Sequence, residues 1–332
     1  VYVTFRQFNR PNGQANAVDI VKSTDCGATF GTAKVIQKFT PYDASDVADP
    51  EATPAGNPAD APFGEESVDG GNARDCGDFA SHCQSGYTFF RRDTQVRSTA
   101  DQADADTTHD YIYIVYDPSK PGTVPTGTTY GSIDTGIGSQ SGIYYLRYDG
   151  ATGAKTEPAL IDNRTRGHQL FPDISAGGGG VLHTVWWDSR NDPNYSPARP
   201  IGNDEDGNTV PSLDVYGAIS TDGGATWTPS TTPLTTQMSN PNYEQFANRT
   251  VPFAGDYLWV TSHGSTAFSV WTDWRDTVQG SDPREGTENE DEDDGSADVL
   301  QCRTFSAASG WSGDTCPHDG GIDQNIYGGT TP

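Results

Sequence analysis

Two acidic segments contain the residues best suited to bind a metal ion. Asp204, Asp206 and Asn208 alternate like the first ligands of a calcium-binding loop, as do Asp291 and Asp293. Neither segment has the Gly at position 6 or the Glu at position 12 that an EF-hand loop requires. A solvated acidic loop has the same composition. The sequence therefore leaves two interpretations, calcium binding and a solvated surface, and it indicates no organic cofactor.

A second pattern places an Asp two residues before an Arg. Asp188 and Arg190 follow one apolar strand, and Asp273 and Arg275 follow another. Residues i and i+2 of a strand lie on the same face, so each Asp can reach its Arg. A catalytic site needs each group once. The repetition therefore predicts structural ion pairs.

Other catalytic signatures are missing from the sequence. There is no H-E-x-x-H and no G-x-S-x-G, and the segment 150–156 fails the P-loop pattern because no Lys follows a Gly at the required spacing. The six histidines form no local cluster. No residue is therefore assigned a catalytic role.

Two nearly identical strings predict the turns that must position these strands. Ser220–Trp227 reads S-T-D-G-G-A-T-W, and Ser23–Phe30 reads S-T-D-C-G-A-T-F. Ser and Asp oxygens can accept backbone N–H bonds in a tight turn, Gly supplies a positive φ, and we expect the aromatic residue to close over the following strand. The shared positions are Ser23, Asp25, Gly27, Thr29 and Phe30 in the first string, and Ser220, Asp222, Gly224, Thr226 and Trp227 in the second.

In this pattern the chain resembles the Asp-box (bacterial neuraminidase repeat) proteins. The resemblance implies a β-propeller with such a turn between the two outer strands of a blade. The family includes sialidases, other glycosidases and proteins without known activity. Its sialidases use an arginine cluster, a Tyr nucleophile with a Glu partner, and an Asp acid. The arginine-Ile-Pro start motif of the family is absent here, with Arg6 and Arg91-Arg92 the nearest strings, and Tyr243-Glu244 is the only adjacent Tyr/Glu pair. We therefore favour a protein without catalysis and keep a sialidase-type exo-glycosidase as an alternative.

Related strands recur along the chain and predict an all-β fold of four-stranded antiparallel blades. Four strands align on Phe5, Tyr116, Trp186 and Trp271, and we expect all four to be buried. Second strands are expected to follow at Ala17–Ser23, Ile143–Tyr148, Asp214–Ser220 and Asp298–Phe305, and Asn325–Gly329 echoes Asp214–Ala218.

The long spacings between these aligned strands require long loop insertions. We predict that residues 1–332 form a single β-propeller domain with at least four blades, six being usual for sialidase-like propellers. Residues 41–84 would be the largest insertion. The chain does not begin with Met and opens within a strand, so we expect an upstream segment to be missing.

The cysteines favour an exported protein. Cys76 with Cys83, and Cys302 with Cys316, would each close a short loop, whereas Cys26 is left over. This pairing rests on proximity, because the sequence allows 15 ways to pair four of five cysteines. Sequons at Asn163, Asn194 and Asn248 would carry glycans in a eukaryotic or archaeal secretory route.

The composition of the chain narrows the range of possible binding partners. Lys and Arg number 20 and Asp and Glu 46, and the net charge of −26 repels nucleic acid and anionic lipid. No apolar run approaches the length that spans a bilayer, so we expect no membrane insertion. The sequence favours an extracellular module that binds a glycan, a cell surface or a protein. A structural subunit of an extracellular assembly is a further alternative, and the oligomeric state stays open.

Overall fold

The computed structural model describes the chain in ten segments, which are residues 1–8, 15–41, 95–102, 108–123, 140–195, 211–239, 258–275, 304–306, 310–312 and 325–331. These residues form β-strands and turns, and they contain no α-helix. It follows that, among them, no helix is long and apolar enough to cross a bilayer. The all-β class predicted from the sequence is confirmed.

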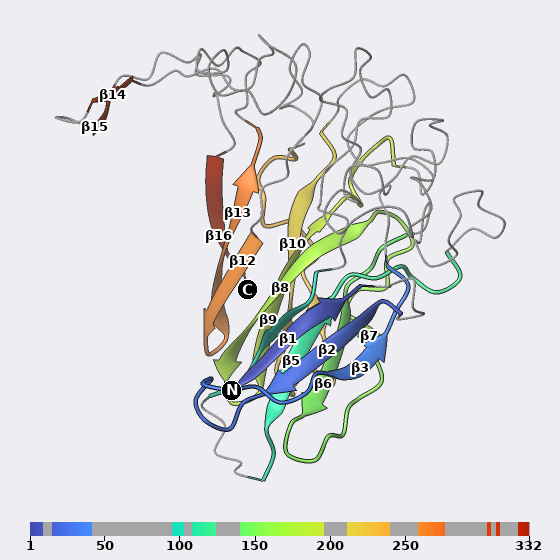
Figure 1. Ribbon diagram of the computed structural model, residues 1–332. Coiled ribbons are helices and arrows are strands. Elements are labelled where there is room, and N and C mark those ends of the chain that lie inside the picture. Colours follow the sequence, from blue (N-terminus) through green and yellow to red (C-terminus); the bar gives the residue numbers. More distant parts are fainter. Residues whose placement is uncertain are drawn as a thin grey trace, which may run out of the picture.

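The strands form four main antiparallel sheets, and in the first three the strands follow one another in chain order (Figure 1). The first sheet contains β1 (Tyr2–Gln7), β2 (Ala17–Lys22) and β3 (Lys34–Lys38). The second contains β4 (Arg97–Thr99), β5 (Tyr111–Tyr116), β6 (Tyr144–Asp149) and β7 (Ala159–Leu160). The third contains β8 (Gln169–Gly178), β9 (Val181–Asp188), β10 (Asp214–Ser220) and β11 (Thr228–Pro229). The fourth contains β12 (Leu258–His263), β13 (Thr266–Asp273) and β16 (Asn325–Thr331), and β14 (Thr304–Ser306) and β15 (Gly310–Ser312) form a separate hairpin.

Successive sheets pack face to face, with their first strands in contact. β1 contacts β4, β4 contacts β8, and β8 contacts β12. Side chains join these strands: the Thr4 hydroxyl donates to Ser98 (2.8 Å), and the backbone N–H of Val260 donates to the Asp173 carboxylate (2.8 Å). The four sheets therefore form one stack in chain order.

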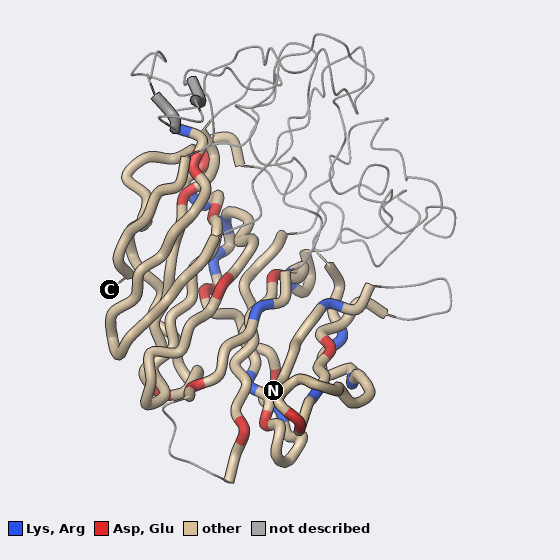
Figure 2. The backbone as a smooth tube through the Cα atoms, turned by 60° about the vertical axis from the view of Figure 1, so that its left-hand side comes forward, with Lys and Arg blue, Asp and Glu red and all other residues tan. Residues whose placement is uncertain are grey.

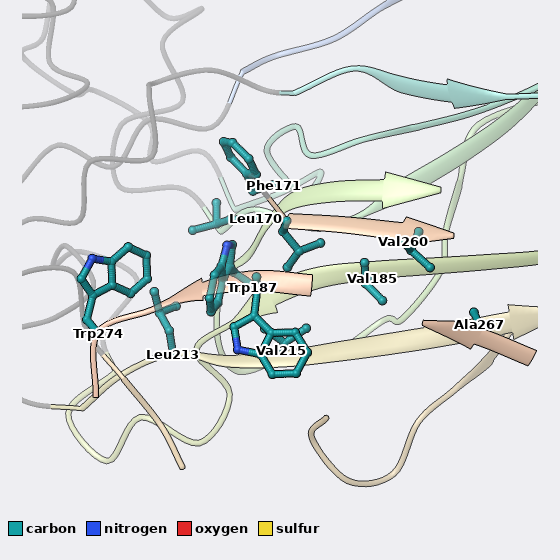
Figure 3. Close-up of a cluster of buried hydrophobic side chains, with 11 residues drawn as sticks. Leu170, Phe171, Val185, Trp187, Leu213, Val215, Val260, Ala267 and Trp274 are labelled. Atoms are coloured by element: carbon teal, nitrogen blue, oxygen red, sulfur yellow. The ribbon is translucent and has the colours of Figure 1, made fainter. Parts of the chain in front are cut away.

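A separate hydrophobic cluster fills each space between neighbouring sheets. Ile20 packs with Ile114 between the first and second sheets. Trp186 lies between the second and third sheets. Trp187, the next residue of β9, lies between the third and fourth sheets with Val260 (Figure 3). Because successive residues of a strand point to opposite faces, a strand in a middle sheet buries both faces.

This stacking explains which strands have continuous apolar runs. β5 and β9 lie in middle sheets and are buried along almost their whole length. β1, β12 and β16 lie in the end sheets, and their burial alternates along the strand. Phe5, expected to be buried like its aligned counterparts, is 38% exposed because it faces outward from the first sheet. The expectation for Phe5 was therefore wrong.

β13 pairs with β16. Trp271 lies opposite Tyr327 in this pair, as Trp186 lies opposite Tyr216 in the third sheet. The similar sequences of 214–218 and 325–329 therefore belong to strands in equivalent positions of the third and fourth sheets. The segment 298–305, which was expected to follow β13 as the next strand, does not pair with β13. Its described part, Thr304–Phe305, pairs with β15 instead.

The four main sheets have three or four antiparallel strands each, so the coarser prediction of antiparallel sheets is confirmed. Within the described residues, these sheets do not close into a ring. Apart from Pro41, the predicted insertion 41–84 lies outside the described residues.

Candidate functional site

The two Asp-box strings form the same turn. In each, the Ser hydroxyl donates to the Asp carboxylate and accepts the backbone N–H of the Gly four residues after it. The Ser–Asp distance is 2.7 Å for Ser23 and 2.8 Å for Ser220. Each Asp carboxylate also accepts the backbone N–H and the hydroxyl of the Thr four residues further on. In both strings, hydrogen bonds among the side chains and backbone groups of the turn itself therefore close the turn.

The residue after each boxed Asp has a positive φ. Cys26 has φ 59° and Gly223 has φ 68°, and the Gly that follows each is positive as well. A non-Gly residue adopts this conformation at a cost. Cys26 is the only cysteine in the described part of the chain, where it is exposed and not in a disulfide.

The aromatic positions of the two boxes differ. Trp227 packs edge-on against Tyr145 of the second sheet with 5.2 Å between ring centroids, and the Tyr145 hydroxyl donates to the backbone carbonyl of Gly223 (2.8 Å). Phe30 is 45% exposed. Trp227 therefore fastens its turn to a neighbouring sheet, and Phe30 has no comparable burial.

The ion pair after β9 belongs to a larger unit. The buried Asp188 carboxylate accepts the indole N–H of Trp186 (2.9 Å) and the backbone N–H of Arg190 (2.8 Å), and it forms an ion pair with the Arg190 guanidinium. That guanidinium lies over the Tyr216 ring, 3.8 Å from its centroid. Trp186, Asp188, Arg190 and Tyr216 are called the third-sheet unit below.

The fourth sheet repeats this arrangement. Asp273 accepts the indole N–H of Trp271 (3.2 Å) and the backbone N–H of Arg275 (3.0 Å), and it forms an ion pair with Arg275 at 2.6 Å. The Arg275 guanidinium lies 4.2 Å from the centroid of Tyr327. Trp271, Asp273, Arg275 and Tyr327 form the fourth-sheet unit. Acidic and basic residues lie side by side where these strands end (Figure 2).

A buried charged network that the sequence reasoning missed joins the second sheet to the third-sheet unit. Arg190 makes a second ion pair with Asp162 at 2.8 Å, and both side chains are only 8% exposed. Lys120 is buried nearby. Burial lowers the pKa of Lys120 to about 8, although Asp188 and Asp162 act to raise it. Arg164 also pairs with Asp162 at 3.1 Å, so three cations and two carboxylates meet in this network.

The three described arginines named in the sequence, Arg6, Arg190 and Arg275, each lie against partners of their own and are not seen to share one. Arg91 and Arg92 lie outside the described residues. Arg190 and Arg275 each lie against an Asp and a Tyr of their own sheet. Arg6 lies in the first sheet, where its guanidinium donates to Asn16 (3.0 Å) and lies 4.3 Å from the ring centroid of Phe8. Tyr243 and Glu244 lie outside the described residues.

A cavity of about 230 Å³ lies where the first and second sheets meet, at the edge that carries the Asp-box turns. Its polar and aromatic lining comes from segments far apart in the sequence: Tyr2, Asp101, His109, Asp110, Tyr111 and Tyr113. The Tyr2 hydroxyl donates to Asp110 (2.6 Å), and Lys22 lies 3.3 Å from the same carboxylate. The sequence reasoning missed this cavity as well.

Several predicted site residues lie outside the described residues. These are Asp204, Asp206, Asn208, Asp291 and Asp293 of the calcium prediction, Cys76, Cys83, Cys302 and Cys316 of the disulfide prediction, and the sequon residue Asn248. All of these stay predictions. Asn163 is exposed and Asn194 is half-buried. Within the described segments, no group of three or more His, Cys, Asp or Glu side chains is arranged to hold a metal.

No family model matches the chain, and a search of curated proteins finds no similar sequence.

Proposed function

We propose that the chain is an Asp-box β-propeller that acts outside the cell as a binding module, without catalysis, for a glycan, a cell surface or a protein. The two matching turns support the Asp-box assignment, since five side-chain contacts recur in each. Meandering sheets whose first strands lie side by side are the arrangement that propeller blades require.

The position of the repeated arginines is the observation that carries the non-catalytic proposal. A sialidase needs several arginines from different blades to hold one substrate carboxylate. Arg190 and Arg275 are instead buried beside Asp188 and Asp273. Freeing either one would leave a buried carboxylate unpaired, which is strongly unfavourable. These guanidinium groups are therefore held by structural ion pairs, which for Arg190 include Asp162 beside the second sheet.

A hydrolysis assay separates this proposal from the exo-glycosidase alternative. The purified full chain is incubated with a fluorogenic sialoside, with a known sialidase as a positive control. We expect no release of the fluorophore above buffer. Release that Arg6→Ala or Tyr243→Phe abolishes, in variants that melt like the wild type, would favour the glycosidase and overturn the proposal.

The outer faces of the stack favour a second candidate, a structural subunit. Val3 and Phe5 are exposed on the first sheet, and Trp259, Phe268 and Ile326 on the fourth. Contact between these two different faces in successive copies would build an open chain of subunits. Sedimentation velocity over a range of concentrations tests this. A single monomeric species is expected for the binding module, whereas growing assemblies that Trp259→Ser prevents would favour the subunit.

A further inference from the structure

The cavity between the first and second sheets lies away from the charged units of the third and fourth sheets. Its residues come from the beginning of β1, the end of β4 and the beginning of β5. Asp101 accepts the backbone N–H of Gly180 (2.9 Å), and Lys22 donates to the carbonyl of Gly150 (3.2 Å). The first bond ties the lining to the third sheet, and Lys22, which also contacts Asp110 of the lining, joins the first sheet to the second. The cavity is therefore part of the folded framework.

An aromatic stack forms part of the lining. The His109 and Tyr111 rings are nearly parallel, with an angle of 8° and 4.8 Å between centroids. The Arg147 guanidinium lies 4.3 Å from the Tyr111 centroid. The Asp149 carboxylate lies 2.7 Å from Nδ1 of His109 and holds the ring in place. The His109 side chain is still 37% exposed. The stack is thus fixed in place and accessible.

Carboxylates supply the polar part of the lining. The Tyr2 hydroxyl and the Lys22 ammonium donate to Asp110, and these bonds lower the pKa of that carboxyl. Asp110 therefore stays ionised at neutral pH and acts only as an acceptor. With Asp101 beside it, the cavity offers negative acceptors to any ligand. These carboxylate oxygens suit a ligand rich in hydroxyl donors, and they cannot hydrogen-bond a carboxylate, sulfate or phosphate group of a ligand.

We propose that this cavity binds an uncharged sugar ring of a glycan. The C–H face of such a ring can pack on the aromatic stack, while its hydroxyl groups donate to Asp110 and Asp101. The cavity volume of about 230 Å³ suits one ring, with the rest of the glycan outside. This inference rests on the proposed binding function, and it names the ligand class and the site.

The test measures glycan binding by the full chain and by matched variants. A glycan array selects uncharged ligands, and titration calorimetry then measures their affinity. Asp110→Asn keeps the shape of a half-exposed side chain but removes its charge, and His109→Ala removes the outer ring of the stack. Glu157→Gln makes the same charge change at an exposed residue outside the cavity and serves as the control. Thermal melts check that all variants are folded.

We expect the wild type and Glu157→Gln to bind the same uncharged glycans equally. Asp110→Asn should bind about tenfold more weakly or worse, because a hydrogen bond to a charged carboxylate is replaced by a weaker one to a neutral amide. If these glycans bind with an affinity that neither Asp110→Asn nor His109→Ala changes, the cavity is not the site, although the proposed binding function stands. Binding of sialylated glycans alone, or of no glycan, also overturns the inference. Sialoside hydrolysis would overturn the proposed function itself.

Discussion

Removal of the Asp188 carboxylate is expected to destabilise the protein severely. Asp188 is completely buried, and it accepts hydrogen bonds from the Trp186 indole, the Arg190 backbone and the Gln169 amide (3.3 Å). Asp188→Ala leaves these donors unpaired and removes one of the two carboxylates that hold Arg190. Breaking a buried ion pair from one side costs about 3–5 kcal/mol.

The fourth-sheet unit provides an internal replicate, and an exposed pair provides the control. Asp273 is equally buried and accepts the corresponding bonds, so Asp273→Ala should cost about 3–5 kcal/mol as well. Lys22 pairs with Asp110 at the surface, where the side chains are 44% and 48% exposed. Lys22→Ala should therefore cost only about 0–1 kcal/mol.

Urea unfolding followed by tryptophan fluorescence measures these differences. The midpoint gives the change in stability, and an unchanged slope shows that the same surface is exposed on unfolding. A loss of about 3–5 kcal/mol is a large part of the roughly 5–15 kcal/mol that stabilises a typical protein. The assignment of Asp188 to a buried structural unit is refuted by one result. In that result, Asp188→Ala has the same dependence of unfolding free energy on urea as the wild type and loses no more stability than Lys22→Ala.

Two further predictions concern the Asp-box turns. Trp227→Ala should cost about 3 kcal/mol of stability because the indole packs against the neighbouring sheet. Phe30→Ala should change the stability by no more than about 0.5 kcal/mol because Phe30 is exposed. Equal losses of stability in thermal melts of the two variants would contradict this difference in burial. Hydrogen bonds from the boxed Thr hydroxyls and backbone N–H groups lower the pKa of Asp25 and Asp222 to about 2. Since the folded pKa is depressed, the stabilising contribution of each carboxylate is complete above the unfolded value near 4 and is lost as the pH falls from there to about 2. Carboxyl carbon shifts measured by NMR should titrate near pH 2, and titration near 3.8 would contradict the described turns.

Local features of the fold could be predicted from the sequence because their causes lie within a few residues. The Asp-box turns are closed by groups at most four residues apart, and the Asp188–Arg190 pair needs only the period of a strand. Asn325–Gly329 could be matched to Asp214–Ala218 for the same reason. Its pairing with β13 could not, since the nearer segment 298–305 was an equally plausible strand by pattern.

Features made by distant residues were missed. Tyr2 and Asp110 are 108 positions apart, and only the packing of the first sheet on the second brings them into one cavity. Lys120 and Asp162 join the network around Arg190 for a similar reason. The pattern of a strand also does not say whether its sheet lies in the middle or at the end of the stack. That distinction decides whether an aromatic residue such as Phe5 is buried.

The Asp–Arg units also bear on how the protein can change in evolution. Each unit lies where the chain leaves its sheet and later returns to it. Asp188 at the end of β9 lies opposite Asp214 at the start of β10, and Asp273 at the end of β13 lies opposite Asn325 at the start of β16. The second connection is about twice as long as the first, yet both leave and re-enter their sheets in the same register. For an unconstrained chain, such a doubling adds only about 0.6 kcal/mol of closure entropy. Insertions at this edge can therefore lengthen, shorten or diverge while the sheets beneath keep their register.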